Sequence, residues 1–189
     1  MSAVPLIAGR DCGECQICCI VPNIDTPEIQ KVSASRCRNC GTVGCTIYDT
    51  RPQVCRAFHC GWQRTADIPA DWRPDISGVM VELELNSLPQ FHPTAFRLVL
   101  VGDLLQTVRR PDFIDFVINN IRNHVALYLT LPGPRGMQAS RLSLNPFLLQ
   151  AISRSRAEVG TALEAALDLL QKNPTMPNII RHSGNDFSG

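Results

Sequence analysis

The stretch Gly78-Val79-Met80-Val81-Glu82-Leu83-Glu84-Leu85 decides which kind of fold this chain of 189 residues adopts. Its apolar residues at 79, 81, 83 and 85 alternate with a methionine and two glutamates, the period of two that is typical of a half-buried strand. Residues 95–101 form a second apolar run after a proline-containing turn. Together the two runs predict an antiparallel pair of strands.

The sequence after this pair predicts further regular elements. Pro111-Asp112 opens a helix whose apolar positions 113, 116, 117, 121 and 125 fall on one face. Residues 127–131 have the pattern of another short strand, with residues 137–144 as its expected partner. Asn145-Pro146 indicates a helix start, and the capping box from Ser155 to Glu158 indicates either a second start or a kink.

The N-terminal part of the chain has a different composition. All nine cysteines lie between Cys12 and Cys60, and none follows. The only regular element predicted here is a short helix with Thr26 as its N-cap and Pro27 at its first position. Apolar residues are too scattered in this part to order the loops by burial, so a bound metal must supply part of the folding energy.

These two parts predict an α+β fold. A loop-rich, cysteine-cluster metal-binding region, residues 1–75, docks on an α+β scaffold formed by residues 76–189. The scaffold consists of a small antiparallel sheet with C-terminal helices. Because the chain is long enough for a core of its own, we expect the two parts to form one compact unit.

The net charge and the hydropathy of the chain indicate which classes of partner the protein is not expected to bind. The formal charge of +1 gives no field that attracts nucleic acid or anionic lipid. No run reaches the roughly 18–20 apolar residues of a membrane helix, and the N-terminus lacks the basic and apolar regions of a signal peptide. We therefore expect a cytoplasmic protein without nucleic-acid or membrane partners. In that reducing compartment, clustered thiols indicate metal ligands or redox groups rather than disulfides.

The spacing of the first cysteines points to metal chemistry. Residues 12–19 have the pattern C-x2-C-x2-C-C, in which a C-x2-C pair lets two thiolates reach one ion from a tight turn. Three thiols at this spacing, with a remote fourth, also wrap the iron–sulfur cube of bacterial ferredoxins. The Cα atoms of the adjacent Cys18 and Cys19 are about 3.8 Å apart, too close for a resting disulfide. Either one of them ligates while the other packs, or they serve two metals.

A second cysteine group lies between residues 37 and 60. Cys37 and Cys40 repeat the C-x2-C spacing, and Gly41 and Gly44 free the backbone for the sharp reversal that a ligand loop needs. Two such pairs, with further clustered thiols, predict a metal site. An all-sulfur tetrahedral site suits both zinc and iron, so the sequence does not decide between a zinc ion and an iron–sulfur cluster. The candidate metal ligands are Cys12, Cys15, Cys18, Cys19, Cys37, Cys40, Cys45, Cys55 and Cys60.

The stretch from Cys45 to Cys60 has the pattern C-x-I-Y-x-x-R-P-x-x-C-R-x-F-x-C. Together with the upstream C-x2-C-x2-C-C, it resembles the YkgJ-like cysteine-cluster family, whose members are described as zinc- or iron-chelating domains. Trp62 and Arg73-Pro74-Asp75 are similar to the longer bacterial members. The resemblance covers roughly residues 12–75 and implies a metal site built from these cysteines. A relative of this cluster is attached to flagellin lysine methylases, which implies that an iron–sulfur role in an enzyme is possible.

Residues around the thiols have expected roles as well. Arg51 and Arg56 are candidates for binding the cofactor, because they can offset the negative charge of a thiolate cluster through hydrogen bonds to sulfur. Alternatively, Arg51 pairs with Asp49 and stacks on Tyr48. The aromatic residues at 58 and 62 are expected to shield the site from water. The histidine at 59 is expected on the surface, and the aspartates at 67, 71 and 75 in loops.

These observations favour a metal-binding protein that acts as an accessory or chelating factor. Two alternatives stay open: an iron–sulfur redox or modifying enzyme with oxidoreductase-like activity, and a zinc-stabilised interaction module without chemistry of its own. Four ligands leave five thiols spare, which favours the enzyme over the module. The chain has no nucleophile elbow, P-loop or dinucleotide fingerprint, so the sequence names no substrate and leaves enzymatic activity undecided.

Overall fold

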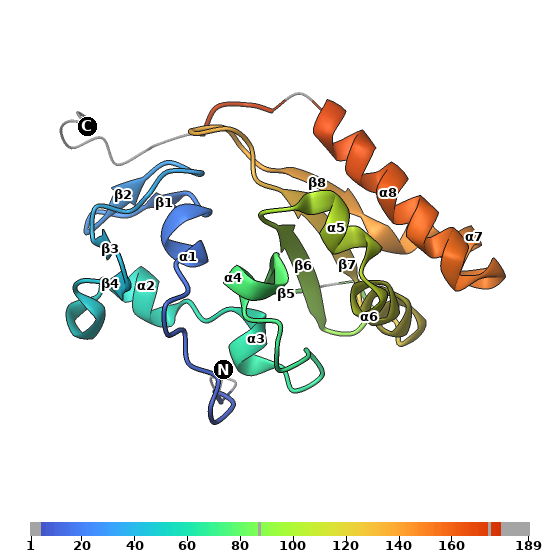
Figure 1. Ribbon diagram of the computed structural model, residues 1–189, viewed down its shortest axis with the longest axis horizontal. Coiled ribbons are helices and arrows are strands. Elements are labelled where there is room, and N and C mark those ends of the chain that lie inside the picture. Colours follow the sequence, from blue (N-terminus) through green and yellow to red (C-terminus); the bar gives the residue numbers. More distant parts are fainter. Residues whose placement is uncertain (1–4, 87, 174, 179–189) are drawn as a thin grey trace.

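The computed structural model describes residues 5–86, 88–173 and 175–178. Its main sheet lies between the cysteine-bearing segments on one side and a layer of helices on the other (Figure 1). The elements before the sheet are short: α1 (Ile17–Ile20), β1 (Ile24–Asp25), β2 (Gln30–Lys31), β3 (Cys40–Gly41), β4 (Gly44–Cys45), a 3-10 turn η1 (Tyr48–Thr50), α2 (Gln53–Ala57), α3 (Gly61–Arg64) and α4 (Pro74–Ser77). The scaffold contains β5 (Val79–Leu85), β6 (Thr94–Leu100), α5 (Leu104–Arg109), α6 (Pro111–Arg122), β7 (Leu127–Leu131), β8 (Ser140–Ser143), α7 (Leu144–Arg154) and α8 (Arg156–Lys172).

The main sheet has the strand order β5-β6-β7-β8. β5 and β6 pair antiparallel from Val79↔Leu100 to Leu85↔Thr94, as the alternation predicted. β7 and β8 are also antiparallel, which confirms the second predicted pair. Only the junction between β6 and β7 is parallel, and α5 and α6 fill the long crossover that such a junction needs. The predicted α+β fold with antiparallel strand pairs and C-terminal helices is therefore confirmed.

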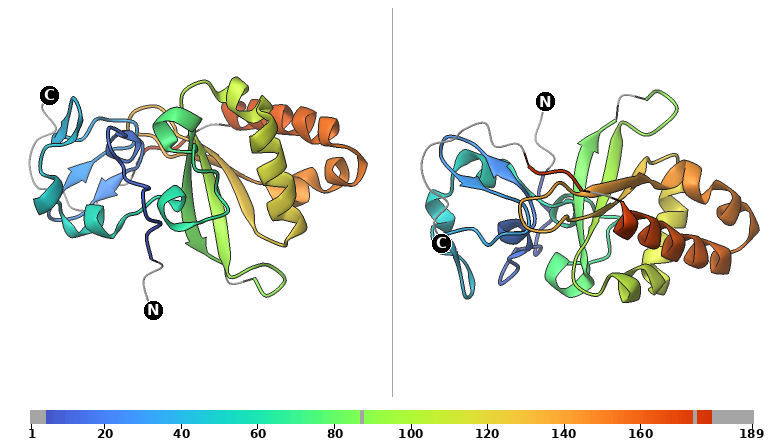
Figure 2. Two further views of the ribbon diagram at one scale, coloured as in Figure 1. Left: turned by 60° about the horizontal axis from the view of Figure 1, so that its bottom comes forward. Right: turned by 90° about the horizontal axis from the view of Figure 1, so that it is seen from above.

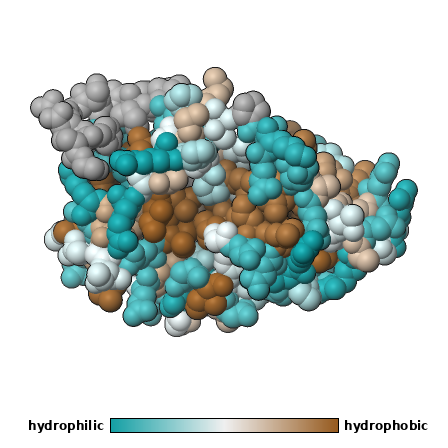
Figure 3. Space-filling view, turned by 45° about the horizontal axis from the view of Figure 1, so that its top comes forward, coloured by the Kyte–Doolittle hydropathy of each residue, from teal (hydrophilic) through white to brown (hydrophobic). Residues whose placement is uncertain are grey.

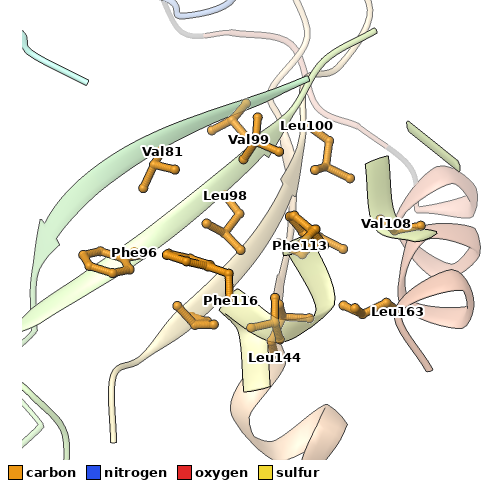
Figure 4. Close-up of a cluster of buried hydrophobic side chains, with 14 of the residues drawn as sticks. Val81, Phe96, Leu98, Val99, Leu100, Val108, Phe113, Phe116, Leu144 and Leu163 are labelled. Carbon is orange, nitrogen blue, oxygen red and sulfur yellow. The ribbon is translucent and has the colours of Figure 1, made fainter. Parts of the chain in front are cut away.

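One face of the sheet carries the core. Cross-strand register places Val81, Leu98 and Leu129 in one row, and all three side chains are fully buried. Helices α5 to α8 cover this face (Figure 2). Phe113 and Phe116 of α6 point into the cluster beside Leu98 (Figure 4), and Val117 is also buried, as predicted for this helix. The predicted position 125 is wrong, because α6 ends at Arg122.

The opposite face of the sheet is charged. Register aligns Glu82, Arg97 and Tyr128 across three strands. Arg97 forms ion pairs with Glu82 and Glu84, and Arg141 both pairs with Glu84 and stacks on the Tyr128 ring, with 3.6 Å from the guanidinium carbon to the ring centroid. Glu82 is only 9% exposed, so other segments of the chain cover part of this charged face.

The second C-terminal helix begins where the capping box indicated. The Ser155 hydroxyl accepts a hydrogen bond from the Glu158 amide at 3.1 Å, and its own backbone is extended, so α7 ends and α8 starts as a separate helix. Among the described residues, no helix is both long and apolar enough to cross a membrane.

The predicted helix at Thr26 is wrong, because this segment is the turn of a β-hairpin. Thr26 Oγ1 accepts a hydrogen bond from the Ile29 amide at 3.2 Å, as a helix cap would, but the chain then reverses and Ile24 pairs with Lys31. A capping hydroxyl serves a turn as well as a helix. Burial decides between the two here, since Ile29 and Lys31 are 3% and 4% exposed and both reach the interior only through the reversal.

Residues 60–75 join the scaffold core although the sequence grouped them with the cysteine region. Trp72 is fully buried and its ring lies 4.9 Å from Phe116 and 5.9 Å from Phe113 of α6. Its indole N–H donates to Asp112 Oδ2 at 2.6 Å. Trp62 and Ile68 belong to the same cluster of buried side chains. The boundary between the loop-rich region and the scaffold core therefore lies near residue 60 and not at residue 75.

The Asp112 carboxylate gives the first testable prediction. Hydrogen bonds from the Arg110 guanidinium, and one from Trp72, hold the pKa of Asp112 below its ordinary value. A depressed pKa stabilises the fold above the unfolded value near 3.9, and this stability is lost as the pH falls through the folded value. Because the carboxylate is partly exposed, we expect Asp112→Asn to lower the free energy of unfolding by only about 1 kcal/mol at pH 7.

Urea denaturation from pH 7 down to pH 3 measures this effect. The difference between wild type and Asp112→Asn should shrink as the pH falls below about 4. Asp168→Asn is the matched control, since in the described part of the chain Asp168 forms an ion pair only with the exposed Lys172 on α8. Equal stability of Asp112→Asn and wild type at pH 7 would contradict the assignment.

Candidate metal centre

A cavity of about 490 Å³ lies between the cysteine region and the charged face of the sheet. Glu82 and Arg97 form part of its sheet wall, and Phe58 and Trp62 also line it. Apolar residues also gather on the outside of the molecule near this junction, in the middle of the face shown in Figure 3. Eight of the nine cysteines line the cavity: Cys12, Cys15, Cys18, Cys19, Cys37, Cys45, Cys55 and Cys60. Two motifs separated in the sequence therefore converge on one space.

The first motif is folded by tight turns. The Cys15 amide donates to the Cys12 carbonyl at 2.9 Å, and the Cys19 amide donates to Gln16 at the same distance. The single turn α1 carries Cys18 and Cys19 toward the cavity. A backbone hydrogen bond of 2.9 Å from the Cys37 amide to the Cys19 carbonyl then joins the second motif to the first.

The second motif uses a turn, a hairpin and a short helix. The Cys40 amide donates to the Cys37 carbonyl at 2.9 Å, the turn expected of a C-x2-C pair. β3 and β4 pair Cys40 with Cys45, and Gly44 takes a φ of 123° that residues with a side chain rarely adopt. Cys55 lies on α2 and Cys60 directly precedes α3. The whole motif is thus short-range structure that presents its thiols inward, apart from Cys40, which does not line the cavity.

The thiols influence one another. A hydrogen bond with Cys18, together with burial, raises the pKa of Cys19 far above its ordinary value, and a hydrogen bond with Cys40 partly opposes this. Burial raises the pKa of Cys55, and charges at Cys37, Cys19 and Cys45 raise it further. Cys19 and Cys55 are therefore protonated thiols at neutral pH. A bound cation would lower the pKa of these thiols and favour the thiolate.

Cys60 lies at the other end of the cavity, with Cys12 and Cys15. Burial raises the pKa of Cys60 to about 11, with further contributions from charges at Cys12 and Cys15. The side chain of Gln63 hydrogen-bonds the Cys12 thiol and accepts from Cys60 Sγ at 4.0 Å. The Cys15 thiol donates to the Asp75 carboxylate. Burial raises the pKa of Asp75, but hydrogen bonds from Arg73 and Cys15 outweigh it and hold the value below normal.

Sequence reasoning missed the polar partners of the thiols. Gln63 is 5% exposed and was not considered, and Asp75 was expected to be an ordinary loop carboxylate. Gln16, inside the first motif, accepts from Cys40 Sγ at 3.3 Å. Lys31 was assigned to a helix but is buried beside the thiols. The position of Gln16 between two motif cysteines was a usable signal, whereas nothing local to the other three indicates contact with a thiol.

The two arginines have different positions. Arg51 lines the cavity and stacks on Tyr48, with 3.7 Å from its guanidinium carbon to the ring centroid. Burial raises the pKa of Cys12 and Cys55, and the Arg51 charge partly opposes this. The predicted stacking on Tyr48 is therefore present, but within the described residues Arg51 forms neither an ion pair with Asp49 nor a hydrogen bond to a cysteine sulfur; its Nε donates to the Tyr48 carbonyl at 2.9 Å. Arg56 is exposed and lies outside the cavity lining, so the structure does not bring it to the thiols. His59 is half-buried and does line the cavity.

The donor set fits a thiophilic metal in its chemistry, because soft sulfur ligands suit zinc and iron–sulfur centres. In the described part of the chain, however, no group of three or more cysteine, histidine, aspartate or glutamate side chains stands ready to hold one ion. The Cys40 thiol, for example, donates to Gln16 Oε1 at 3.3 Å. Coordination therefore requires thiol side chains to rotate on a backbone that is already folded around them.

Comparison with family models gave no match, and comparisons with curated proteins and with solved structures gave no significant one. The likeness to YkgJ-like proteins rests on the cysteine motifs quoted above.

Proposed function

We propose that this protein binds metal through the thiols of the cavity, as a zinc or iron–sulfur protein of the cytoplasm that acts as an accessory or chelating factor. The observation that carries the proposal is the convergence of eight cysteines from two motifs on one cavity. Membership of the YkgJ-like family is part of the same proposal, supported by the motif positions filled between Cys45 and Cys60.

In this proposal, different residues around the cavity bind the metal, offset its charge and exclude water. Cysteines from α1, the Cys37 turn and α2 hold the metal, and Arg51 offsets the charge of the thiolates that form. Phe58 and Trp62 exclude water from the same cavity. A bound metal supplies concentrated positive charge or, if it is an iron–sulfur centre, an electron.

An iron–sulfur enzyme is the second candidate, and the size of the cavity favours it. A volume of about 490 Å³ falls within the range of roughly 300–1,000 Å³ that is usual for small-molecule sites. Glu82 and Arg97 on the sheet wall then offer polar groups to a substrate beside the centre. A structural zinc ion alone needs neither the space nor the charged wall.

Metal analysis with a visible absorption spectrum, on protein purified without oxygen, tests the proposal. We expect at least one equivalent of zinc or iron per chain, and a visible charge-transfer band if the metal is iron. Protein that contains no metal and whose nine thiols all titrate freely would refute it.

Single variants sharpen this test. Cys37→Ser and Cys55→Ser remove thiols that line the cavity, so we expect each to lose most of the bound metal. Cys40→Ser is the matched control, since it makes the same chemical change at the one cysteine outside the lining. Equal loss from all three variants would mean that the cavity does not define the ligand set.

A further inference from the structure

Lysine is rare in this chain. Among 18 basic residues only Lys31 and Lys172 are lysines, and they occupy opposite environments. The Lys172 side chain is 73% exposed at the end of α8, whereas Lys31 is 4% exposed. Burying an ammonium group is costly unless it is paired or fully hydrogen-bonded. The burial of Lys31 must therefore be offset by hydrogen bonds or by nearby negative charge.

The ammonium group of Lys31 is held by backbone carbonyls alone. Its Nζ donates to Ile20 at 2.8 Å, to Pro22 at 2.7 Å and to Val32 at 3.3 Å, so its three donors all find acceptors. Within the described residues no carboxylate forms an ion pair with it. A compact ammonium suits this three-carbonyl site, whereas the broad planar guanidinium of arginine does not. Hydrogen bonds stabilise the group, but its charge is left without a counterion.

Two of the three carbonyls that hold Lys31, those of Ile20 and Pro22, belong to the segment that carries two candidate ligands. Ile20 is the last residue of α1, directly after Cys18 and Cys19, and Pro22 follows in the turn out of it. The Nζ hydrogen bonds thus tie the end of α1 to β2. The backbone of Cys19 is in turn bonded to Cys37. Lys31 supports the junction where the two cysteine motifs meet.

The charges that act on Lys31 come from the same thiols. Burial lowers the pKa of Lys31 to about 8, and this is opposed by the negative charge that the neighbouring thiols acquire when they lose a proton. Those thiols are Cys37, Cys19, Cys18 and Cys40, the first three of which line the cavity. Lys31 is therefore placed where its charge can offset negative charge on the cavity thiols when they lose their protons.

We propose that Lys31 is a positioning and charge-compensating residue of the metal centre, which it prepares for a centre that carries net negative charge. Four thiolates around a divalent zinc ion, or four around an iron–sulfur cluster, form such a centre. This inference rests on the proposed function and adds to it the electrostatic character of the bound group. The buried ammonium favours thiolate over thiol at the ligands, which are otherwise held protonated by burial.

Cobalt(II) binding to metal-free protein tests the inference, with the ion itself as the probe and the thiolate-to-cobalt absorption as the signal. We expect Lys31→Met to weaken binding about tenfold at pH 7 and to move the pH midpoint of binding upward by roughly one unit. Lys172→Met removes the same charge from an exposed position and should bind like wild type. If Lys31→Met does not fold, Lys31→Gln removes the charge but keeps a hydrogen-bond donor.

The outcomes distinguish the role of Lys31 from metal binding itself. Identical cobalt titrations for Lys31→Met and Lys172→Met would overturn the role of Lys31 while leaving metal binding intact. Failure of the wild type to bind cobalt would instead remove the proposed function itself. Reductive methylation of wild type adds a measurement without a variant: bound cobalt should slow the labelling of Lys31 at least tenfold and leave Lys172 unchanged. Equal labelling of Lys31 with and without cobalt would also overturn the inference.

Discussion

Chelation of the bound metal is expected to abolish hydrogen-exchange protection in residues 10–59 while the scaffold keeps its protection. The cysteine loops contain only short elements, and α1 and α2 bury none of their residues fully. A structural thiolate site contributes on the order of 10 kcal/mol to folding in small zinc peptides, enough to order loops of this kind. β5 to β8, by contrast, pack against α5 to α8 through a continuous apolar cluster, and most of its members lie after residue 60.

The prediction also states where in the chain the loss of hydrogen-exchange protection stops, at residue 60. Residues 60–75 should behave like the scaffold, because Trp72 packs on α6 and its indole donates to Asp112. Hydrogen exchange with mass spectrometry, with and without chelator, resolves the two segments. Cys55→Ser should reproduce the effect of chelator without any added reagent, and Ser153→Ala on the exposed surface of α7 should not. Uniform loss of protection, or none before residue 60, would show that the thiols do not organise this region.

Phe113→Ala is expected to lower the free energy of unfolding by about 3–5 kcal/mol. Phe113 is fully buried and stacks on Trp72, so truncation leaves a cavity at the contact between the scaffold helices and residues 60–75. That loss is a large share of the roughly 5–15 kcal/mol that stabilises an ordinary domain. Denaturant unfolding followed by tryptophan fluorescence measures it, and Trp72 reports directly from the site of the change.

Phe147→Ala is the matched control for this substitution. Phe147 lies on α7 with 37% of its surface exposed, so the same truncation should cost about 1 kcal/mol or less. If both phenylalanine variants lost the same stability, the interior position of Phe113 would be contradicted.

Local sequence patterns predicted the scaffold well, for a clear reason. Alternation over residues 79–85 and 95–101 specifies a strand whose one face is buried, and β5 and β6 pair as expected. The capping box at Ser155 is satisfied within four residues, so its structure depends on no distant partner. The parallel junction between β6 and β7 was not predictable in this way, because strand direction depends on where a crossover returns the chain.

The gathering of the cysteines was also readable from the sequence, since C-x2-C turns and a glycine hairpin form locally. The spacing did not indicate which groups would contact the thiols. Gln63 and Asp75 reach the thiols of Cys12 and Cys15 from separate elements, and Arg56, although next to Cys55, is exposed. Proximity along the chain was therefore a poor guide to contact.

The sequence alone determined the strand pair, the C-terminal helices and the clustering of thiols, because each follows from periodicity or spacing within short segments. The tertiary structure decided the rest. The segment after Thr26 forms a hairpin and not a helix, because the pairing of Ile24 with Lys31 and the bonds from Lys31 to the end of α1 accompany the burial of Ile29 and Lys31. The burial of Lys31 beside Cys19 and of Trp72 against α6 likewise depends on contacts between separate elements, whose free energy no local pattern contains.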